Sequence, residues 1–427
     1  VEHFKGNAII LATGAAENVV AFDGWTLPGV MGAGAAQTLM NLYGVMPGQN
    51  ILMIGSGNVG LVVGYQLLQA GCRLKAVVDV APQVGGYGVH AAKLARTGVP
   101  FYLSHTVVRA EGDGRVERAV IAEVDSDFKP VSGTEQVIEA DAVCLAVGLS
   151  PMSQLARIAG CDMKREGGGS VPICDEYGET SIPGIFAAGD VSGIEEASSA
   201  MIGGRIAGLA AAREAGFLEE EQFSVRVAEQ RSSLEKLRHG MFAPGVDRRG
   251  MTKTAEGYPL SSSLLRKGYL TPEDLGPFPI PQGQKTVHPV IECTQNIPCN
   301  PCEDACRFGC IKVGTEITHI PEAVHADQCT GCGMCVASCP GQAIFLVDET
   351  YGDGYATVTF PYEFLPRPRK NEFGWALDRS GRPVCRAEIL DVRSAKAFDR
   401  TCLVTMKVPA DLAMTARFYQ AEREGNS

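Results

Sequence analysis

Continuous apolar runs that end in a glycine turn dominate the first half of the chain. Residues 9–11, 50–54 and 142–147 each have this form, which is typical of strands buried on both faces of a parallel sheet. Residues 61–70 have a helical period, and residues 74–78 indicate a further strand. The alternation of strands and helices predicts an α/β fold.

The pattern changes further along the chain. Short segments of alternating polarity over 99–137 predict a β-meander, and 219–239 has the period of a helix with a mostly charged, solvated face. Gly, Pro and Ser are frequent over 240–287, which we interpret as a linker tied down on the surface. Apolar runs separated by Pro and Gly predict a small β-rich domain over 348–427.

Composition narrows the class of protein. The 427 residues are 45% hydrophobic and 20% charged, as in ordinary globular proteins, and the net charge of −11 disfavours nucleic-acid binding. No apolar run reaches the ~20 residues that a membrane span needs. Because no signal peptide is evident, the fifteen cysteines are expected as thiols in a reducing cytoplasm rather than as disulfides.

The strand at 50–54 runs directly into a Gly-x-Gly-x-x-Gly turn, followed by a helix and a second strand. This is the fingerprint of dinucleotide binding in its required context, with the phosphates at the N-terminus of the helix. The expected nucleotide-binding residues are Gly55, Gly57, Asn58, Val59 and Gly60. The alternative is a degenerate unit kept only for packing.

Asp79 ends the second strand of this unit, 22 residues after Gly57. A carboxylate near this position binds the ribose hydroxyls of the adenosine and repels a 2′-phosphate, so NAD(H) is favoured over NADP(H). A structural ATP or ADP is the alternative occupant.

Nine cysteines lie between residues 293 and 340. The second half of this stretch reads Cys-x2-Cys-x2-Cys-x3-Cys-Pro, the run of bacterial ferredoxins, in which the fourth thiolate binds a second cluster. The first half repeats the run with a longer first spacing. We therefore predict two [4Fe–4S] clusters. Set I is Cys293, Cys299, Cys302 and Cys339. Set II is Cys306, Cys329, Cys332 and Cys335.

Three further cysteines, Cys310, Cys385 and Cys402, are expected to be packing residues. Aligning the two halves places Cys310 on Ala343, a small buried position. Cys385 and Cys402 lack ligand spacing and are expected in a core. Structural zinc is the alternative for paired C-x2-C motifs, although three closely spaced cysteines followed by Cys-Pro are unusual for zinc.

Three motifs occur in the order found in flavoprotein oxidoreductases with two dinucleotide-binding domains: Ala-Thr-Gly at 12–14, the glycine turn at 55–60 and Ala-Ala-Gly-Asp at 187–190. The sequences of 24–30 and 193–200 further resemble α subunits of multisubunit amine and imino-acid dehydrogenases. These include sarcosine oxidase, dye-linked proline dehydrogenase, opine oxidase and hydrogen cyanide synthase.

The resemblance covers roughly residues 8–215 and implies bound FAD. The residues expected to contact FAD are Thr13, Gly14, Gly148, Gly189 and Asp190. The FAD domain of this family opens with its own strand and glycine turn, and no such segment stands ahead of 12–14. We expect that first half from residues before Val1 or from a separate polypeptide. A [2Fe–2S] site of the family's cysteine-rich tail is expected to be lost.

These expectations divide the chain into six segments of a two-dinucleotide-binding-domain flavoprotein with a ferredoxin-like domain and a β-rich tail. They are 1–45 and 141–215 (FAD-binding), 46–140 (NAD(H)-binding, Rossmann-like), 216–287 (helix and surface linker), 288–347 (ferredoxin) and 348–427 (β-rich domain).

No acid–base catalyst is predicted, because the seven histidines are scattered and no hydrolase motif occurs. The chemistry is then left to cofactors. We expect an electron-transfer oxidoreductase subunit that passes electrons between NAD(H), FAD and two [4Fe–4S] clusters. Its expected partners are a subunit that oxidises an amine or imino acid and a small redox carrier. The alternatives are an NAD(P)H:acceptor oxidoreductase similar to the small subunit of glutamate synthase, and a non-catalytic electron wire.

Overall fold

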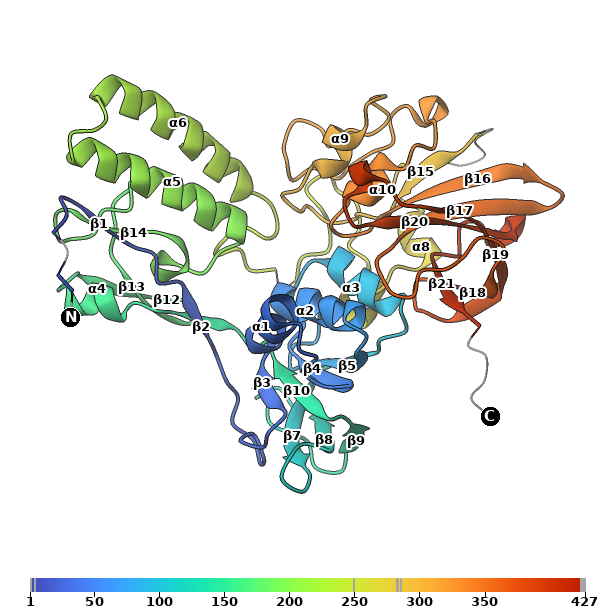
Figure 1. The fold of residues 1–427 in the computed structure, drawn as a ribbon, viewed down its shortest axis with the longest axis horizontal. Coiled ribbons are helices and arrows are strands. Elements are labelled where there is room, and N and C mark those ends of the chain that lie inside the picture. Colours follow the sequence, from blue (N-terminus) through green and yellow to red (C-terminus); the bar gives the residue numbers. More distant parts are fainter. Residues whose placement is uncertain (1, 4, 249, 282–283, 285, 423–427) are drawn as a thin grey trace. The chain divides into compact units, whose positions relative to one another are not determined.

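The computed structural model describes residues 2–3, 5–248, 250–281, 284 and 286–422. The chain forms two compact units (Figure 1). The first unit comprises Val1–Asn18, Gly148–Arg249 and Glu316–Thr318, and the second comprises Val19–Val147, Gly250–Thr315 and His319–Ser427.

The second unit contains a parallel sheet of five strands in the order β3-β10-β4-β5-β6. These strands are β3 (Val30–Gly32), β10 (Ala142–Leu145), β4 (Asn50–Ile54), β5 (Arg73–Asp79) and β6 (Phe101–Leu103). The central strand β4 is buried over 51–54, as its unbroken apolar run predicts. The predicted α/β fold is confirmed.

Different layers cover the two faces of this sheet. Ile51 and Met53 pack on the helical side, where the helices are α1 (Ala33–Tyr43), α2 (Asn58–Gln69) and α3 (Gly88–Ala95). Leu52 and Ile54 pack on the opposite side, against an antiparallel sheet. Its strands are β7 (His105–Glu111), β8 (Arg118–Glu123) and β9 (Gln136–Glu139). The predicted meander is therefore a separate sheet on this face.

The cysteine-rich segment and the C-terminal tail share one antiparallel sheet of seven strands, in the order β15-β16-β17-β20-β19-β18-β21. The strands are β15 (His288–Ile291), β16 (Ile344–Gly352), β17 (Tyr355–Tyr362), β18 (Phe373–Leu377), β19 (Pro383–Arg393), β20 (Cys402–Pro409) and β21 (Phe418–Ala421). Between β15 and β16 lie α9 (Pro301–Ala305), η2 (Ala326–Gln328) and α10 (Met334–Ser338), and the tail adds η3 (Lys396–Phe398) and η4 (Ala410–Leu412). Backbone pairing of β16 with β17 joins the cysteine-rich segment directly to the tail.

A buried ion cluster also connects these two parts. Glu292, which follows β15, accepts hydrogen bonds from Arg379 and Arg417, and none of the three is more than 8% exposed. Burial alone would raise the pKa of the Glu292 carboxyl, but the two guanidinium groups outweigh burial and lower this pKa to about 2. The cluster therefore fixes the end of β15 against the tail.

The part of the predicted linker that follows residue 249 belongs to the second unit. It contains α7 (Ser262–Lys267) and α8 (Pro272–Leu275), whose N-termini are capped by the side chains of Ser261 and Thr271. Leu264, Leu270 and Leu275 are buried, so the linker is tied down as predicted, but part of it is core rather than surface. Residues 249, 282, 283 and 285 of the predicted linker lie outside the described residues.

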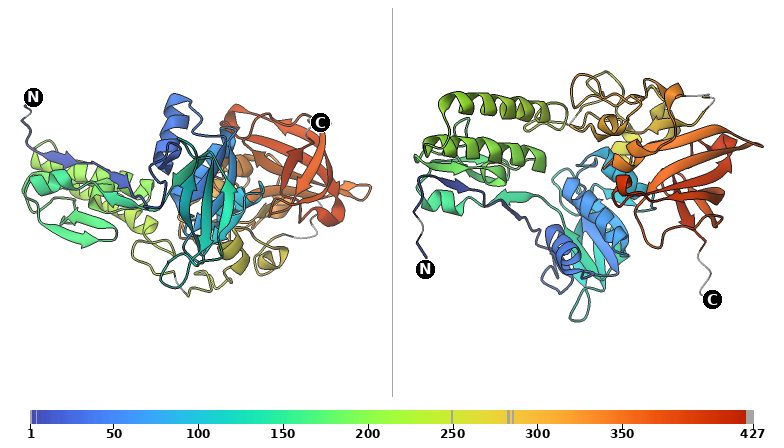
Figure 2. Two further views of the ribbon diagram at one scale, coloured as in Figure 1. Left: turned by 90° about the horizontal axis from the view of Figure 1, so that it is seen from below. Right: turned by 45° about the horizontal axis from the view of Figure 1, so that its top comes forward.

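The first unit is built on a parallel pair of strands, β1 (Ile9–Leu11) and β14 (Ile185–Ala187). Two long helices, α5 (Ala197–Glu214) and α6 (Glu220–Leu237), pack side by side (Figure 2). The smaller elements are β2 (Ala15–Glu17), β11 (Leu149–Pro151), α4 (Gln154–Ile158), β12 (Met163–Glu166), β13 (Gly169–Pro172) and η1 (Gly189–Ser192). Nowhere in the described parts of either unit is a helix long and apolar enough to cross a bilayer.

Candidate cofactor sites

The glycine turn between β4 and α2 has two glycines that packing requires and one that faces open space. A Cβ on Gly55 (φ +109°) would lie 2.2 Å from the carbonyl oxygen of Ala146, and a Cβ on Gly60 would lie 2.1 Å from that of Gly55. A Cβ on Gly57 would meet no heavy atom within 4 Å. Because Gly57 is the N-cap of α2, this space lies at a helix N-terminus, where a phosphate fits.

Asp79, at the end of β5, holds the turn from the other side. One of its carboxylate oxygens accepts hydrogen bonds from the backbone N–H and the hydroxyl of Ser56, both at 2.6 Å, and the other accepts one from Ala81 N–H at 2.9 Å. Asp79 therefore positions the turn, and its contact with a ribose stays a prediction. Sequence reasoning missed the role of Ser56, whose backbone N–H and hydroxyl both donate to Asp79.

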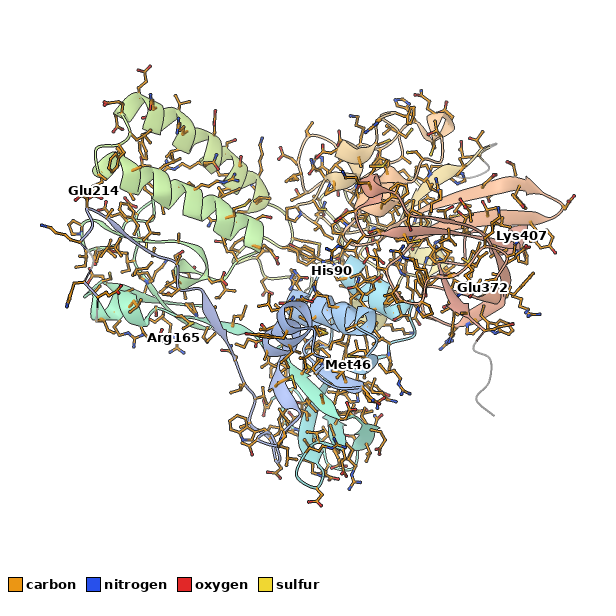
Figure 3. The ribbon with its side chains drawn as sticks, in the orientation of Figure 1. Met46, His90, Arg165, Glu214, Glu372 and Lys407 are labelled. Carbon is orange, nitrogen blue, oxygen red and sulfur yellow. The ribbon has the colours of Figure 1, made fainter. Side chains whose placement is uncertain are left out.

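The segment after β5 packs over the same turn. Gly85 donates to the Ser56 hydroxyl at 3.0 Å, Gly86 donates to the Ser56 carbonyl at 2.8 Å, and Tyr87 donates to Asn58 Oδ1 at 2.8 Å. The Asn58 side chain thus orders this loop, whereas Val59 remains 41% exposed. The loop leads directly into α3, which carries His90 (labelled in Figure 3).

In the first unit the predicted FAD contacts follow two neighbouring parallel strands. Thr13 and Gly14 come after β1, and Gly189 and Asp190 come after β14. Because Leu11 pairs with Ala187, both segments leave the sheet at the same edge. Gly14 and Gly189 have φ of +70° and +76°, the left-handed conformation that glycine adopts readily.

Thr13 and Gly148, two of the residues expected to contact FAD, make contacts within the protein. The Thr13 hydroxyl donates to the carbonyl of Met152 at 2.6 Å. Gly148 stands beside Asn18, at the far end of the β2–β11 ribbon from Gly14. The structure therefore brings four of the five predicted residues to one edge and places Gly148 away from them.

The cysteines gather in the two predicted sets. The thiol of Cys293 interacts electrostatically with those of Cys299, Cys302 and Cys339, and the thiol of Cys335 interacts with those of Cys306, Cys329 and Cys332. Each set thus joins three cysteines of one half to the last cysteine of the other half. A cavity is lined by the four cysteines of set II and also by Cys310.

For several of these thiols, burial raises the pKa and so favours the protonated form in the free protein. Burial first, and then neighbouring cysteines, raise the pKa of Cys299 to about 11 and that of Cys302 to about 12. Burial likewise raises the pKa of Cys335 far above its ordinary value. Iron must therefore displace protons when it binds, as thiolate-bound metals do.

Backbone N–H groups point at the sulfurs in the same way in both halves. Cys310 N–H donates to Cys306 Sγ at 3.2 Å, and Ala343 N–H donates to Cys339 Sγ at 3.4 Å. Such hydrogen bonds stabilise sulfur ligands of iron. Cys310 is 2% exposed, so its predicted burial is confirmed.

The tail cysteines lie apart from these sets. Cys402 is fully buried in the core of the C-terminal sheet, as predicted, and Cys385 packs against that core while half-buried. Over the described ranges, no three His, Cys, Asp or Glu side chains converge on a point where they could hold one metal ion. The four thiolates of a [4Fe–4S] cluster each bind a different iron atom, so the two cysteine sets are candidates for clusters and not for a single ion.

Two family models match the chain and indicate its class of protein. Residues 1–204 match the family described as pyridine nucleotide-disulphide oxidoreductase, and residues 322–345 match the 4Fe-4S binding domain. The chain is therefore an oxidoreductase of the flavin and iron–sulfur type. The second match includes Cys329, Cys332, Cys335 and Cys339.

Among curated proteins the chain is similar to an opine oxidase subunit from Rhizobium meliloti, with 33% identity over 52% of this chain and 44% of that one. A hydrogen cyanide synthase subunit, HcnB of Pseudomonas aeruginosa, is 32% identical over 47% of each chain. The alpha subunit of sarcosine oxidase from Corynebacterium sp. (strain P-1) is 29% identical over 50% of this chain and 21% of that one.

These matches confirm the resemblance inferred from the sequence: the chain is related to this group of subunits and carries a 4Fe–4S domain. The chain spans less than half the length of each of these three relatives.

Proposed function

We propose that this chain is an electron-transfer subunit that passes electrons between NAD(H), FAD and two [4Fe–4S] clusters. The observation that carries the proposal is the assembly of the cysteines into two sets, each completed by a cysteine from the other half of the repeat. This exchange of ligands is the arrangement of two-cluster ferredoxins. When bound, a flavin exchanges electrons in pairs with a nicotinamide and singly with iron–sulfur clusters.

The second unit supplies the nicotinamide nucleotide site in this proposal. The open space at Gly57 admits the pyrophosphate, and the N-terminus of α2 stabilises its charge. Asp79 holds Ser56 and contributes a negative charge that disfavours a 2′-phosphate. The site is therefore proposed to bind NAD(H).

The first unit supplies part of the FAD site. Thr13, Gly14, Gly189 and Asp190 stand at the carboxyl edge of a sheet that has two strands in the described residues. Ile9 and Ile10 of β1 are 54% and 43% exposed, which is unusual for parallel strands. We propose that further strands, from the same or another polypeptide, complete this sheet and the FAD site. Residues 1–427 alone should then bind FAD weakly, and stoichiometric tight FAD would contradict joint binding.

The relatives' names suggest the context of this electron transfer. They are subunits of opine oxidase, hydrogen cyanide synthase and sarcosine oxidase. We propose that a partner subunit oxidises an amine or imino acid and exchanges electrons with this chain, with a small redox carrier as a further partner in the cytoplasm.

An anaerobic titration of the intact complex with NADH tests the proposal. We expect bleaching of the flavin and iron–sulfur absorbance together, at a rate that depends on NADH concentration. An unchanged spectrum, with an adenine nucleotide retained on the protein, would contradict electron transfer from NADH and favour a structural nucleotide.

Gly57→Ala gives a matched variant for this titration. The new methyl group meets no protein atom and Gly57 has φ −68°, so the fold should be unaffected, but the methyl group occupies the space proposed for the pyrophosphate. We expect NADH affinity to fall at least tenfold, about 1.4 kcal/mol, with an unchanged melting temperature. Equal NADH affinity in the variant and the wild type would place the nucleotide elsewhere.

A further inference from the structure

Helix α3 of the nucleotide-binding domain is held at both ends by the loops that carry set I. At its first residue, Gly88 N–H donates to Gln295 Oε1 at 2.7 Å, and Gln295 lies in the long spacing between Cys293 and Cys299. Just past its last residue, Arg96 donates to the carbonyl and the side-chain oxygen of Gln342, at 2.8 and 3.0 Å. Gln342 is three residues after Cys339.

Arg96 acts on the segment that supports the Cys339 sulfur. Gln342 has φ +51°, in the left-handed region that non-glycine residues rarely adopt. Arg96 and the Tyr65 hydroxyl both bind the Gln342 side chain and hold this conformation. The following residue, Ala343, then directs its N–H to Cys339 Sγ.

The same helix places two cations beside set I. Arg96 is 5% exposed and Lys93 is 7% exposed, and both interact electrostatically with Cys339. Lys93 Nζ also donates to the carbonyl of Pro340 at 3.3 Å. Electrostatic interactions are stronger in a protein interior than in water, so these charges act on set I with little screening.

The other charges near Arg96 and Lys93, which are buried or half-buried, leave the balance positive. Arg379 and Arg417 pair with Glu292, the neighbour of Cys293, and Glu363 interacts with both Lys93 and Arg96. The four cations therefore face two carboxylates.

Set II has a different environment. Cys332 is exposed and Phe308, which lines the same cavity, is 50% exposed. One arginine, Arg393, reaches the carbonyls of Gly331 and Cys332 at 3.4 Å, and its side chain is 34% exposed. Solvent screens this charge.

We propose that Arg96 and Lys93 of α3 raise the reduction potential of the cluster bound by set I above that of the cluster bound by set II. Added electrons make a cluster more negative, so adjacent buried cations stabilise its reduced form. The nucleotide-binding domain thereby sets the potential of the cluster it contacts. This inference rests on the proposed function, because it requires both clusters.

An EPR-monitored redox titration of the complex tests this assignment. Cys329→Ser leaves set I intact and Cys299→Ser leaves set II intact, so the two signals can be assigned separately. In Arg96→Met we expect the reduction equilibrium of the set I cluster to become at least tenfold less favourable, which is 59 mV for one electron. Arg96→Lys, which keeps the charge, should recover most of the shift, and Lys93→Gln should shift the same signal in the same direction.

Arg393→Met is the matched control, and it should leave the potential of the set I cluster unchanged. If Arg96→Met fails to fold, the inference is tested with Lys93→Gln alone. An unchanged reduction potential of the set I cluster in that variant would overturn the inference. Equal shifts of both clusters in the α3 variants would also overturn it. Wild-type protein without two cluster signals would instead contradict the proposed function.

Discussion

The two halves of the cysteine repeat share a backbone design but differ in what surrounds them. In both, the cysteine that crosses to the other set is followed by a left-handed residue, Gly309 (φ +65°) or Gln342 (φ +51°). The next N–H then reaches the sulfur. Gly309 has no side chain that could form a hydrogen bond, whereas the side chain of Gln342 accepts hydrogen bonds from Tyr65 and Arg96 of the nucleotide-binding domain. The turn at Gln342 is thus part of an internal interface, whereas the turn at Gly309 faces open space, because a Cβ on Gly309 would meet no heavy atom within 4 Å.

The largest contrast is expected from removing the two crossing cysteines. Cys306→Ser and Cys339→Ser each remove one cluster ligand, so the iron content should fall from about eight to about four atoms per chain in both. Cys339→Ser should also lower the melting temperature further, because its loop anchors α3. Metal analysis and calorimetry measure the two effects. Equal losses of thermal stability would show that the halves do not differ in this way.

Two glutamates provide the next contrast. Glu292→Gln leaves Arg379 and Arg417 buried without their counter-ion and should cost about 3–5 kcal/mol in the free energy of unfolding. Glu303→Gln, next to Cys302 of set I, weakens a pair with Lys312, whose side chain is 55% exposed, and should cost about 1 kcal/mol or less. Urea unfolding of both variants checks this order, and similar costs would mean that the buried cluster contributes no more than a surface pair.

The smallest effects on the free energy of unfolding should come from exchanging the two residues with positive φ, by the changes Gln342→Gly and Gly309→Gln. Gln342→Gly removes backbone strain but also loses the two hydrogen bonds that the side-chain oxygen accepts from Tyr65 and Arg96, which offset this gain at about 1 kcal/mol each. Its net effect on stability should be within about 1 kcal/mol. Gly309→Gln gains the strain with no such partner and should destabilise by at least about 1 kcal/mol. A stabilising Gly309→Gln change would refute this account of the two turns.

Local patterns were sufficient to predict the elements that carry the sites. The glycine turn lies between a buried strand and a helix, and the cysteine spacing alone led to the two sets. The helix expected over 219–239 is α6 (Glu220–Leu237). These features depend on residues close together in the sequence, where period and spacing are informative.

Long-range pairings could not be predicted in the same way. Arg96 meets Gln342 across 246 residues, and Glu292 meets Arg417 across 125 residues, with no local signal for either contact. The hairpin of β16 and β17, which joins the cysteine-rich segment to the tail, was also missed, although it is local and Asp353-Gly354 between the strands is a hairpin signal. For the long-range contacts one signal was available: the longer spacing from Cys293 to Cys299, which accommodates the Gln295 contact with α3.

Quantifying iron and acid-labile sulfide in anaerobically purified protein, together with EPR of the reduced form, tests the central claim most directly. The proposed function predicts about eight iron and eight sulfide per chain, with signals from two [4Fe–4S] clusters. One or two zinc ions per chain with no labile sulfide would contradict it.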